Sequence, residues 1–456
     1  MKLLIAALAT LQLGVAQVKL PQYSRDTLPN GAVILMLPRT GVPLVHFRIL
    51  IKGGTEAEPP QMAGLASVTS ALLRKGTAKR TADQFSQELD FLGGTFDAGA
   101  DNSSTTITAE FLGKDFDRGL DLLSDAVLNP AFPEQEAVKE LARRVDAARS
   151  VKDNAQAAIG SYLRTAFYGK QHPYGNPPDE TTLARIQRKD IVDFYGRIYR
   201  GRNLIVAVTG DFDPAQAKAK LAEVFGKSPA GTAYAWAAAP ALTRKGRLTL
   251  VDKPDATQTY FQIAQPGIDR KNADRVKLDL VNTIFGGRFT SMLNDELRVN
   301  TGLTYGASSS VERSRLPGAI TISTYAKTET TVQAIDLALA ILKRLSDTGI
   351  TAEQLASAKA YVKGLFPTSR LETMDQLAGV MGELELNGLT RDEIDGYFER
   401  IDAVTLADAN AVAKKYYRSD GLTMVLVGPA GKIGGDVKKY DANPVVVPIK
   451  APGWGQ

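Results

Sequence analysis

The sequence predicts an α+β fold of two homologous domains of about 220 residues, each a mainly antiparallel sheet packed with helices, facing each other across a cleft. Three observations predict it. Strand and helix patterns are mixed along the chain, an internal duplication repeats them, and a Pro, Gly and Ala-rich segment separates the copies. We expect the first domain at 17–226, a linker at 227–245 and the second domain at 246–456.

The duplication is visible at two places. Residues 198–210 match 416–428 at a constant offset of 218 positions, and both segments end in an apolar run followed by glycine. Residues 106–108 match 321–323 at an offset of 215 positions. Two copies of this length indicate two related domains, whereas a solenoid needs shorter and more numerous units.

The composition is that of a soluble globular protein, with 44% hydrophobic and 23% charged residues among 456. The net charge of +5 is small for this length, and no dense basic cluster with interleaved aromatics occurs, which argues against a nucleic-acid interface. There is no cysteine, and the two histidines, His46 and His172, lie far apart. We therefore expect no transition metal bound by this chain alone, and structural roles for both histidines.

The N-terminus resembles a secretory signal. A positive start at Met1–Lys2 precedes an apolar run over 3–15, and small residues precede a cut after Ala16. The alternative is a buried first helix, because the run is too short to span a bilayer. We expect a signal peptide at 1–16 and an exported, periplasmic protein.

Within the first domain the patterns predict alternating strands and helices. Thr81 is the expected N-cap of a helix through Leu92. The expected strands are 32–37, 44–51, a strand pair over 95–111, and 203–209; the other expected helices are 115–128, one from 133 onward, and 191–199.

The stretch Gly64–Thr77 combines a helical apolar face with small residues. Leu65, Val68 and Leu72 share the face, and Ser67, Ser70 and Ala71 are among the small residues. On pattern alone this is a buried helix that another element approaches closely.

The frame of this stretch resembles the pitrilysin/insulinase family of inverted-motif zinc peptidases, whose first domain carries Gly-x-Ala-His-x-x-Glu-His, a short apolar run and Gly-Thr. On that frame the two ligand histidines fall on Ser67 and Ala71, and the catalytic glutamate on Ser70. The resemblance extends over 28–429. All three functional positions lack zinc-binding or catalytic groups, so this helix is not expected to hold a metal.

The resemblance implies a third zinc ligand, a glutamate, on the helix that begins at Pro133. Asp146 is the only acid in the corresponding window 146–148, and without histidines nearby we expect it to be a solvated helix residue.

The second domain contains a stretch that resembles the family's Gly-Gly-x-x-x-Ser-x-Leu, Leu-Arg and Gly-Leu-x-Tyr pattern over 285–305. In active relatives the arginine and tyrosine of this pattern reach the substrate, and here they are Arg298 and Tyr305. Tyrosine can donate to an oxyanion, and arginine can hold a carbonyl or carboxylate. The alternative is that both residues only pack.

The resemblance implies a metal-free subunit of a heterodimeric zinc peptidase, with Arg298 and Tyr305 binding peptide and zinc held by a homologous partner. Peptide would bind by addition to a sheet edge. The alternative is a non-enzymatic, homodimeric peptide-binding or scaffold protein. A hydrolase using Ser67 or Ser70 is disfavoured, because no activating base or nucleophile elbow lies nearby in the sequence.

Overall fold

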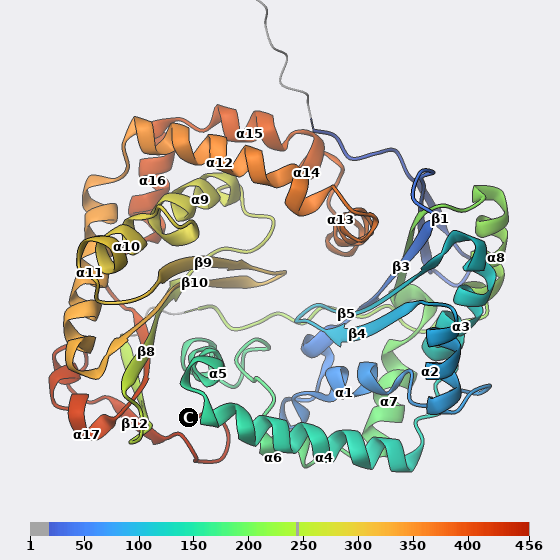
Figure 1. Ribbon diagram of the computed structural model, residues 1–456, viewed down its shortest axis with the longest axis horizontal. Coiled ribbons are helices and arrows are strands. Elements are labelled where there is room, and N and C mark those ends of the chain that lie inside the picture. The colour runs from blue at the N-terminus through green and yellow to red at the C-terminus, as the bar shows by residue number, and fades with distance from the viewer. Residues whose placement is uncertain (1–17, 243–245, 456) are drawn as a thin grey trace, which may run out of the picture.

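The computed structural model describes residues 18–242 and 246–455 and consists of two halves, each a six-stranded mixed sheet with helices (Figure 1). The predicted α+β fold of two related domains is confirmed. The expected signal peptide, 1–16, lies outside the described residues. Within those residues, no helix has the length and apolar character needed to cross a membrane.

The first half contains six strands and eight α-helices among the described residues. The strands are β1 (Ser24–Thr27), β2 (Val33–Pro38), β3 (Leu44–Lys52), β4 (Thr95–Ala100), β5 (Ser104–Leu112) and β6 (Leu204–Gly210). The helices are α1 (Leu65–Leu72), α2 (Ala82–Phe91), α3 (Phe116–Leu128), α4 (Glu134–Ser150), α5 (Ala155–Tyr168), α6 (Glu180–Leu183), α7 (Arg188–Ile198) and α8 (Pro214–Gly226).

The second half repeats this order with extra short helices. Its strands are β7 (Arg247–Asp252), β8 (Gln258–Pro266), β9 (Ala307–Arg313), β10 (Pro317–Lys327), β11 (Thr423–Gly428) and β12 (Val445–Pro448). Its helices are α9 (Arg275–Asn282), α10 (Met292–Asn294), α11 (Thr331–Thr348), α12 (Ala352–Arg370), α13 (Met374–Asn387), α14 (Asp392–Asp395), α15 (Tyr397–Ala403), α16 (Leu406–Tyr416) and α17 (Ala430–Ile433).

The sheet topology follows the duplication found in the sequence. The first sheet has the order β1-β2-β6-β3-β5-β4, with only β2 and β6 parallel; the second has the order β12-β7-β11-β8-β10-β9, with β12, β7 and β11 mutually parallel. The repeated segments place β6 and β11 at equivalent positions, each between a parallel and an antiparallel neighbour. Both sheets end in a free edge at equivalent strands, β4 and β9.

Each sheet is covered on its second face by a helix from the other half. Helix α13 packs on β3 and β6 of the first sheet, and α5 packs on β8 and β11 of the second (Figure 1). The two helices occupy equivalent positions in the duplicated order, so the exchange is reciprocal. Neither half therefore has a complete core of its own.

The sequence of α13 explains its close fit. Leu377, Met381 and Leu384 fall on one face of the helix and are buried against the first sheet. Gly382 lies so close to Leu50 that an added Cβ would be 2.2 Å from its Cδ1 atom, so a larger residue here would require the Leu50 side chain to move. The local sequence therefore fixes both the contact face and the distance of approach.

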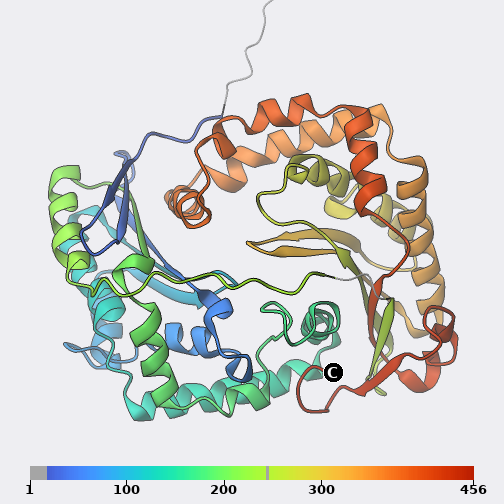
Figure 2. The ribbon, with the colours of Figure 1, turned by 180° about the vertical axis from the view of Figure 1, so that it is seen from behind.

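Residues 229–242 join the halves without forming a helix or strand, and cross behind them (Figure 2). Tyr234 holds this segment to the first half: its backbone N–H donates to Asn203 Oδ1 at 2.7 Å and its hydroxyl donates to the Glu56 carbonyl at 2.9 Å. Most of the segment is solvent-accessible.

We expect Met381→Ala to lower the free energy of unfolding by about 2–5 kcal/mol, because it opens a cavity at a fully buried position between the halves. Equilibrium denaturation in urea measures this change. Val138→Ala, on an exposed face of α4, serves as the control and should change stability by less than about 0.5 kcal/mol. Equal effects of the two substitutions would contradict the role given to α13.

Candidate functional site

Helix α1 begins at a glycine that no other residue could replace easily. Gly64 has φ of 101°, and an added Cβ would lie 2.7 Å from Leu183 Cδ2. The carboxylate of Glu58 accepts the backbone N–H groups of Gly64 at 3.0 Å and Ala66 at 2.7 Å. An acidic side chain thus caps the positive end of the helix that carries the motif positions.

The motif positions on α1 are held by an arginine of α4. Arg144 donates from Nη1 to Ser67 Oγ at 3.2 Å and from Nη2 to the Ser67 carbonyl at 3.1 Å. Ser70 Oγ donates back to the same carbonyl at 2.9 Å, and Ala71 contributes only a methyl group. A guanidinium therefore supplies the positive charge beside these positions.

The carboxylate that orients Arg144 is Glu140, a residue that we did not predict from the sequence. Arg144 Nε donates to Glu140 Oε1 at 2.6 Å, and Arg143 donates to both of its oxygens. Burial opposes ionisation of Glu140, but these hydrogen bonds outweigh it and hold its pKa below the usual value. Asp146 is exposed and pairs with Arg149 at 3.3 Å, as expected of a solvated residue. The spacing of Glu140 and Arg144, one helical turn, was the available signal.

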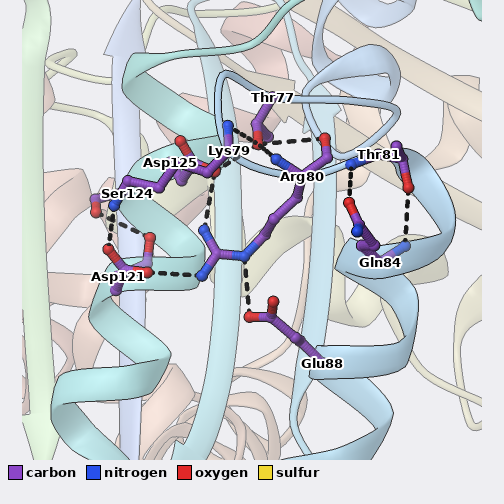
Figure 3. A network of polar contacts seen from close by, with 9 residues as sticks. All are labelled: Thr77, Lys79, Arg80, Thr81, Gln84, Glu88, Asp121, Ser124 and Asp125. Atoms are coloured by element: carbon purple, nitrogen blue, oxygen red, sulfur yellow. Dashed lines mark hydrogen bonds and ion pairs between the residues drawn. The ribbon is translucent and has the colours of Figure 1, made fainter.

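The loop that follows α1 is fixed to α3 by a network of charges (Figure 3). The Thr77 hydroxyl donates to the buried carboxylate of Asp125, and Arg80 donates to Asp125 at 2.9 Å, Asp121 at 2.7 Å and Glu88 at 2.9 Å. Thr81 caps α2 through a capping box, which confirms the predicted N-cap. The Gly-Thr end of the motif frame therefore keeps a structural role although the motif chemistry is absent.

A chamber of about 890 Å³ lies between the halves. Its walls come from β3 and β5, the segment 173–178, α5, the β9–β10 hairpin and the α12–α13 region. Its ionisable side chains are those of Arg48, Glu58, Asp101, Arg164, Tyr174, Arg270, Glu312, Arg313, Arg315, Arg370, Asp375 and Glu383. The mixture of both charges suits a polar, peptide-like ligand better than an apolar one.

The halves are joined across one side of the chamber by an ion pair. Arg315, at the turn of the β9–β10 hairpin, donates twice to Glu56 Oε2, once at 3.0 Å, and its guanidinium lies 4.9 Å from the Trp236 ring centroid. The other oxygen of Glu56 accepts Tyr174 and Ser103 hydroxyls, each at 3.1 Å. Because the Glu56 side chain is only 2% exposed, this contact is shielded from solvent.

Arg298 and Tyr305 lie away from this chamber. Arg298 is exposed on the π-helical turn η7 (Asp295–Asn300) and stacks over Phe289, with 4.8 Å between the guanidinium carbon and the ring centroid. Tyr305, 77% exposed, precedes β9 at the end of the hairpin opposite Arg315. The structure thus separates this pair from the α1 positions of the same chain, and their role in binding substrate stays a prediction.

Both histidines are buried in structural settings. His46 Nε2 lies 2.9 Å from Asp375 Oδ1 on α13, and burial lowers its pKa despite that carboxylate. His172 stacks on Tyr168 and accepts the backbone N–H of Tyr174 at 3.1 Å; burial lowers its pKa to about 4. Among the described residues, no group of three or more His, Asp or Glu side chains has a metal-binding arrangement.

The α1 positions do not fit zinc. Two serine hydroxyls and a methyl group provide no strong donor, and the guanidinium on Ser67 would repel a cation. This helix therefore has no residues at these positions that could support a metal-dependent step.

Two related α+β halves that close over a polar chamber define a two-domain protein with an internal cavity. Residues 35–177 match the model of the insulinase family, peptidase family M16, and residues 185–362 match that of the peptidase M16 inactive domain. The chain belongs to the insulinase family, peptidase family M16.

Relatives and solved structures extend the match over most of the chain. An uncharacterized zinc protease of Mycobacterium bovis is 27% identical over 89% of this chain and 93% of its own length, and one of Bacillus subtilis is 25% identical over 90% and 99%. The peptidase M16 inactive domain from Pseudomonas fluorescens has a TM-score of 0.83 at 24% identity over 90% and 98% of the two chains. A protease from Helicobacter pylori has a TM-score of 0.79 at 21% identity over 90% and 100%. At these identities the solved structures establish the shared fold.

Glu58 lines the chamber and makes the stability of the fold depend on pH. Burial raises its pKa to about 7, although the backbone N–H groups of Ala66 and Gly64 favour the charged form. The carboxyl group of Glu58 binds its proton more strongly in the folded state than in the unfolded chain. Its contribution to the free energy of unfolding is therefore present at low pH and is lost as pH rises through about 7. We expect the wild type to lose stability relative to Glu58→Gln as pH rises from about 4.5 to about 7, the window between the ordinary and the raised pKa of this carboxyl group. Urea titrations across this range test it, with the exposed Glu134→Gln as control; a constant difference between wild type and Glu58→Gln would contradict it.

Grafting the family's motif onto α1 should not create a metal site. In Ser67→His/Ser70→Glu/Ala71→His, the backbone carbonyl of residue 67 remains available to Arg144, and the window 146–148 provides no inward carboxylate. We expect the folded triple variant to retain no stoichiometric zinc after dialysis, as measured by plasma mass spectrometry. One zinc per chain would show that neither feature prevents binding.

Proposed function

We propose that this chain is the metal-free subunit of a heterodimeric zinc peptidase and that Arg298 and Tyr305 contact substrate in a site whose zinc belongs to a homologous partner. The observation that carries the proposal is the position of this pair. Arg298 and Tyr305 are exposed at the end of the β9–β10 hairpin that is farther from the first half, which makes them accessible to another chain.

The chemistry of the pair suits peptide bond cleavage. Tyr305 can donate its hydroxyl to the oxyanion that forms when a peptide carbonyl is attacked, and the forked donors of Arg298 can hold a substrate carbonyl or carboxylate. Phe289 beneath Arg298 limits the motion of the guanidinium.

A peptide can also be held by the first half. Strand β4 is the free edge of its sheet and packs beside α1, and Asp97 and Gly99 of β4 line a smaller cavity of about 450 Å³. An extended peptide added to this edge gains main-chain hydrogen bonds with little sequence preference. The exported, periplasmic location expected from the N-terminus is part of the same proposal.

A second candidate is a homodimeric peptide-binding or scaffold protein without catalysis. The chamber favours the peptide-binding part of this candidate, since its polar walls are complete within one chain. Isolation of the chain with a zinc-bearing homologue, compared with isolation as a homodimer, distinguishes the two.

The catalytic proposal is tested by mixing this chain with a zinc-bearing homologue and measuring cleavage of a peptide library. We expect only the mixture to be active, and we expect Tyr305→Phe or Arg298→Ala to lower kcat/KM by about 10²–10³-fold, as for the loss of one oxyanion donor. Arg418→Ala, an exposed arginine that pairs with Asp420 and does not line the chamber, is the matched control for Arg298→Ala and should leave the rate unchanged.

Two results would count against the proposal. If the chain alone bound one zinc and cleaved peptides, it would be an independent enzyme. If the mixture were active but insensitive to both substitutions, the pair would have no part in catalysis.

A further inference from the structure

Two arginines stand where the chamber meets a second cavity. This cavity, of about 470 Å³, lies beside α12 and α13 and shares with the chamber the side chains of Arg270, Arg313, Arg370 and Glu383. Arg270 precedes α9, Arg370 ends α12, and Glu383 lies on α13. Three separate segments therefore bring charge to one point.

The two guanidiniums depend on a single carboxylate. Arg370 Nη2 donates to Glu383 Oε2 at 2.6 Å, and Arg270 contacts Glu383 Oε1. The side chains of Arg270 and Arg370 remain 32% and 41% exposed, so an incoming ligand can reach them. Guanidinium forks bind carboxylates in bidentate fashion, and one shared carboxylate leaves donors unused.

The second cavity carries an excess of positive charge. Its lining has four arginines but only three carboxylates, Asp279, Glu383 and Glu393. Arg313 pairs with Asp279 at 2.6 Å, and Arg275 donates to Glu393 at 3.2 Å, which leaves Arg270 and Arg370 to share Glu383. Burial, reinforced by Arg370 and Arg313, lowers the pKa of Arg270 to about 10. Because Arg270 and Arg370 share one carboxylate, their unused donors would stabilise an anion that binds at this point.

We infer that Arg270 and Arg370 form a receptor for a carboxylate of the bound peptide, supplied by an acidic side chain or by the C-terminus. The inference rests on peptide binding in the chamber, as in the second candidate function, and adds a substrate class to it: peptides that place a negative charge at the junction of the two cavities. Glu383 occupies part of the receptor in the free chain, and the ligand carboxylate shares or replaces its contacts.

The test measures binding of fluorescent peptides to the full chain by anisotropy at low ionic strength. One series replaces each Glu or Asp of a bound peptide by Gln or Asn, and a second replaces the C-terminal carboxylate by an amide. We expect one of the two changes to weaken binding about tenfold, which is the effect of a charge-assisted hydrogen bond, and the series that responds identifies the source of the carboxylate.

Variants of the receptor should change affinity in opposite directions. Arg370→Gln removes one guanidinium. It should abolish the difference in affinity between the peptide that carries the recognised carboxylate and its amide counterpart from the series that responds. Glu383→Gln removes the internal competitor and should strengthen binding of the acidic peptide. Arg418→Gln, an exposed arginine paired with Asp420 outside both cavities, is the matched control and should leave affinity unchanged. Circular dichroism melts of each variant check that the fold is retained.

The outcomes separate this inference from the proposal beneath it. Equal affinity for the acidic and amide peptides, or weaker acidic-peptide binding by Glu383→Gln, would overturn the carboxylate receptor while leaving peptide binding intact. Failure of every peptide to bind would instead overturn the peptide-binding role itself.

Discussion

The sheet face that each half turns towards the other is apolar at its centre and is covered by the neighbour's helix, α13 on the first sheet and α5 on the second. This reciprocal burial sets the distance between the halves and so the width of the chamber. The ion pair of Glu56 with Arg315 joins the halves at another point, but burial of apolar surface contributes most of the favourable energy. A chamber with polar walls is possible because the halves already share an apolar core elsewhere.

Much of the fold could be predicted because it depends on local sequence patterns, and these patterns occur twice in the chain. The match of 198–210 with 416–428 corresponds to the equivalent central strands β6 and β11. The N-cap at Thr81 could be predicted because its partner in the capping box, Gln84, lies only three positions away. The exchange of α5 and α13 could not, because an amphipathic helix shows which face is buried but not which sheet covers it.

The candidate site shows the same division between local and distant information. The absence of ligands at Ser67, Ser70 and Ala71 follows directly from the residue types. Arg144 could not be assigned to Ser67 without the packing of α4 against α1, since the two residues are 77 positions apart. The sequence pattern around Arg298 and Tyr305 also could not show that they lie on the outer end of a hairpin.

The hydrogen bonds of Arg144 have a consequence for how the first half responds to its surroundings. A metal held at a helix can be removed by chelators, by acid or by a shortage of the ion, and the surrounding structure then loses a positive charge. Here the charge belongs to the polypeptide and remains at every pH at which the protein is folded. The conformation around α1 is thus independent of metal supply. This half keeps its conformation under conditions that would remove the metal from a zinc-binding helix.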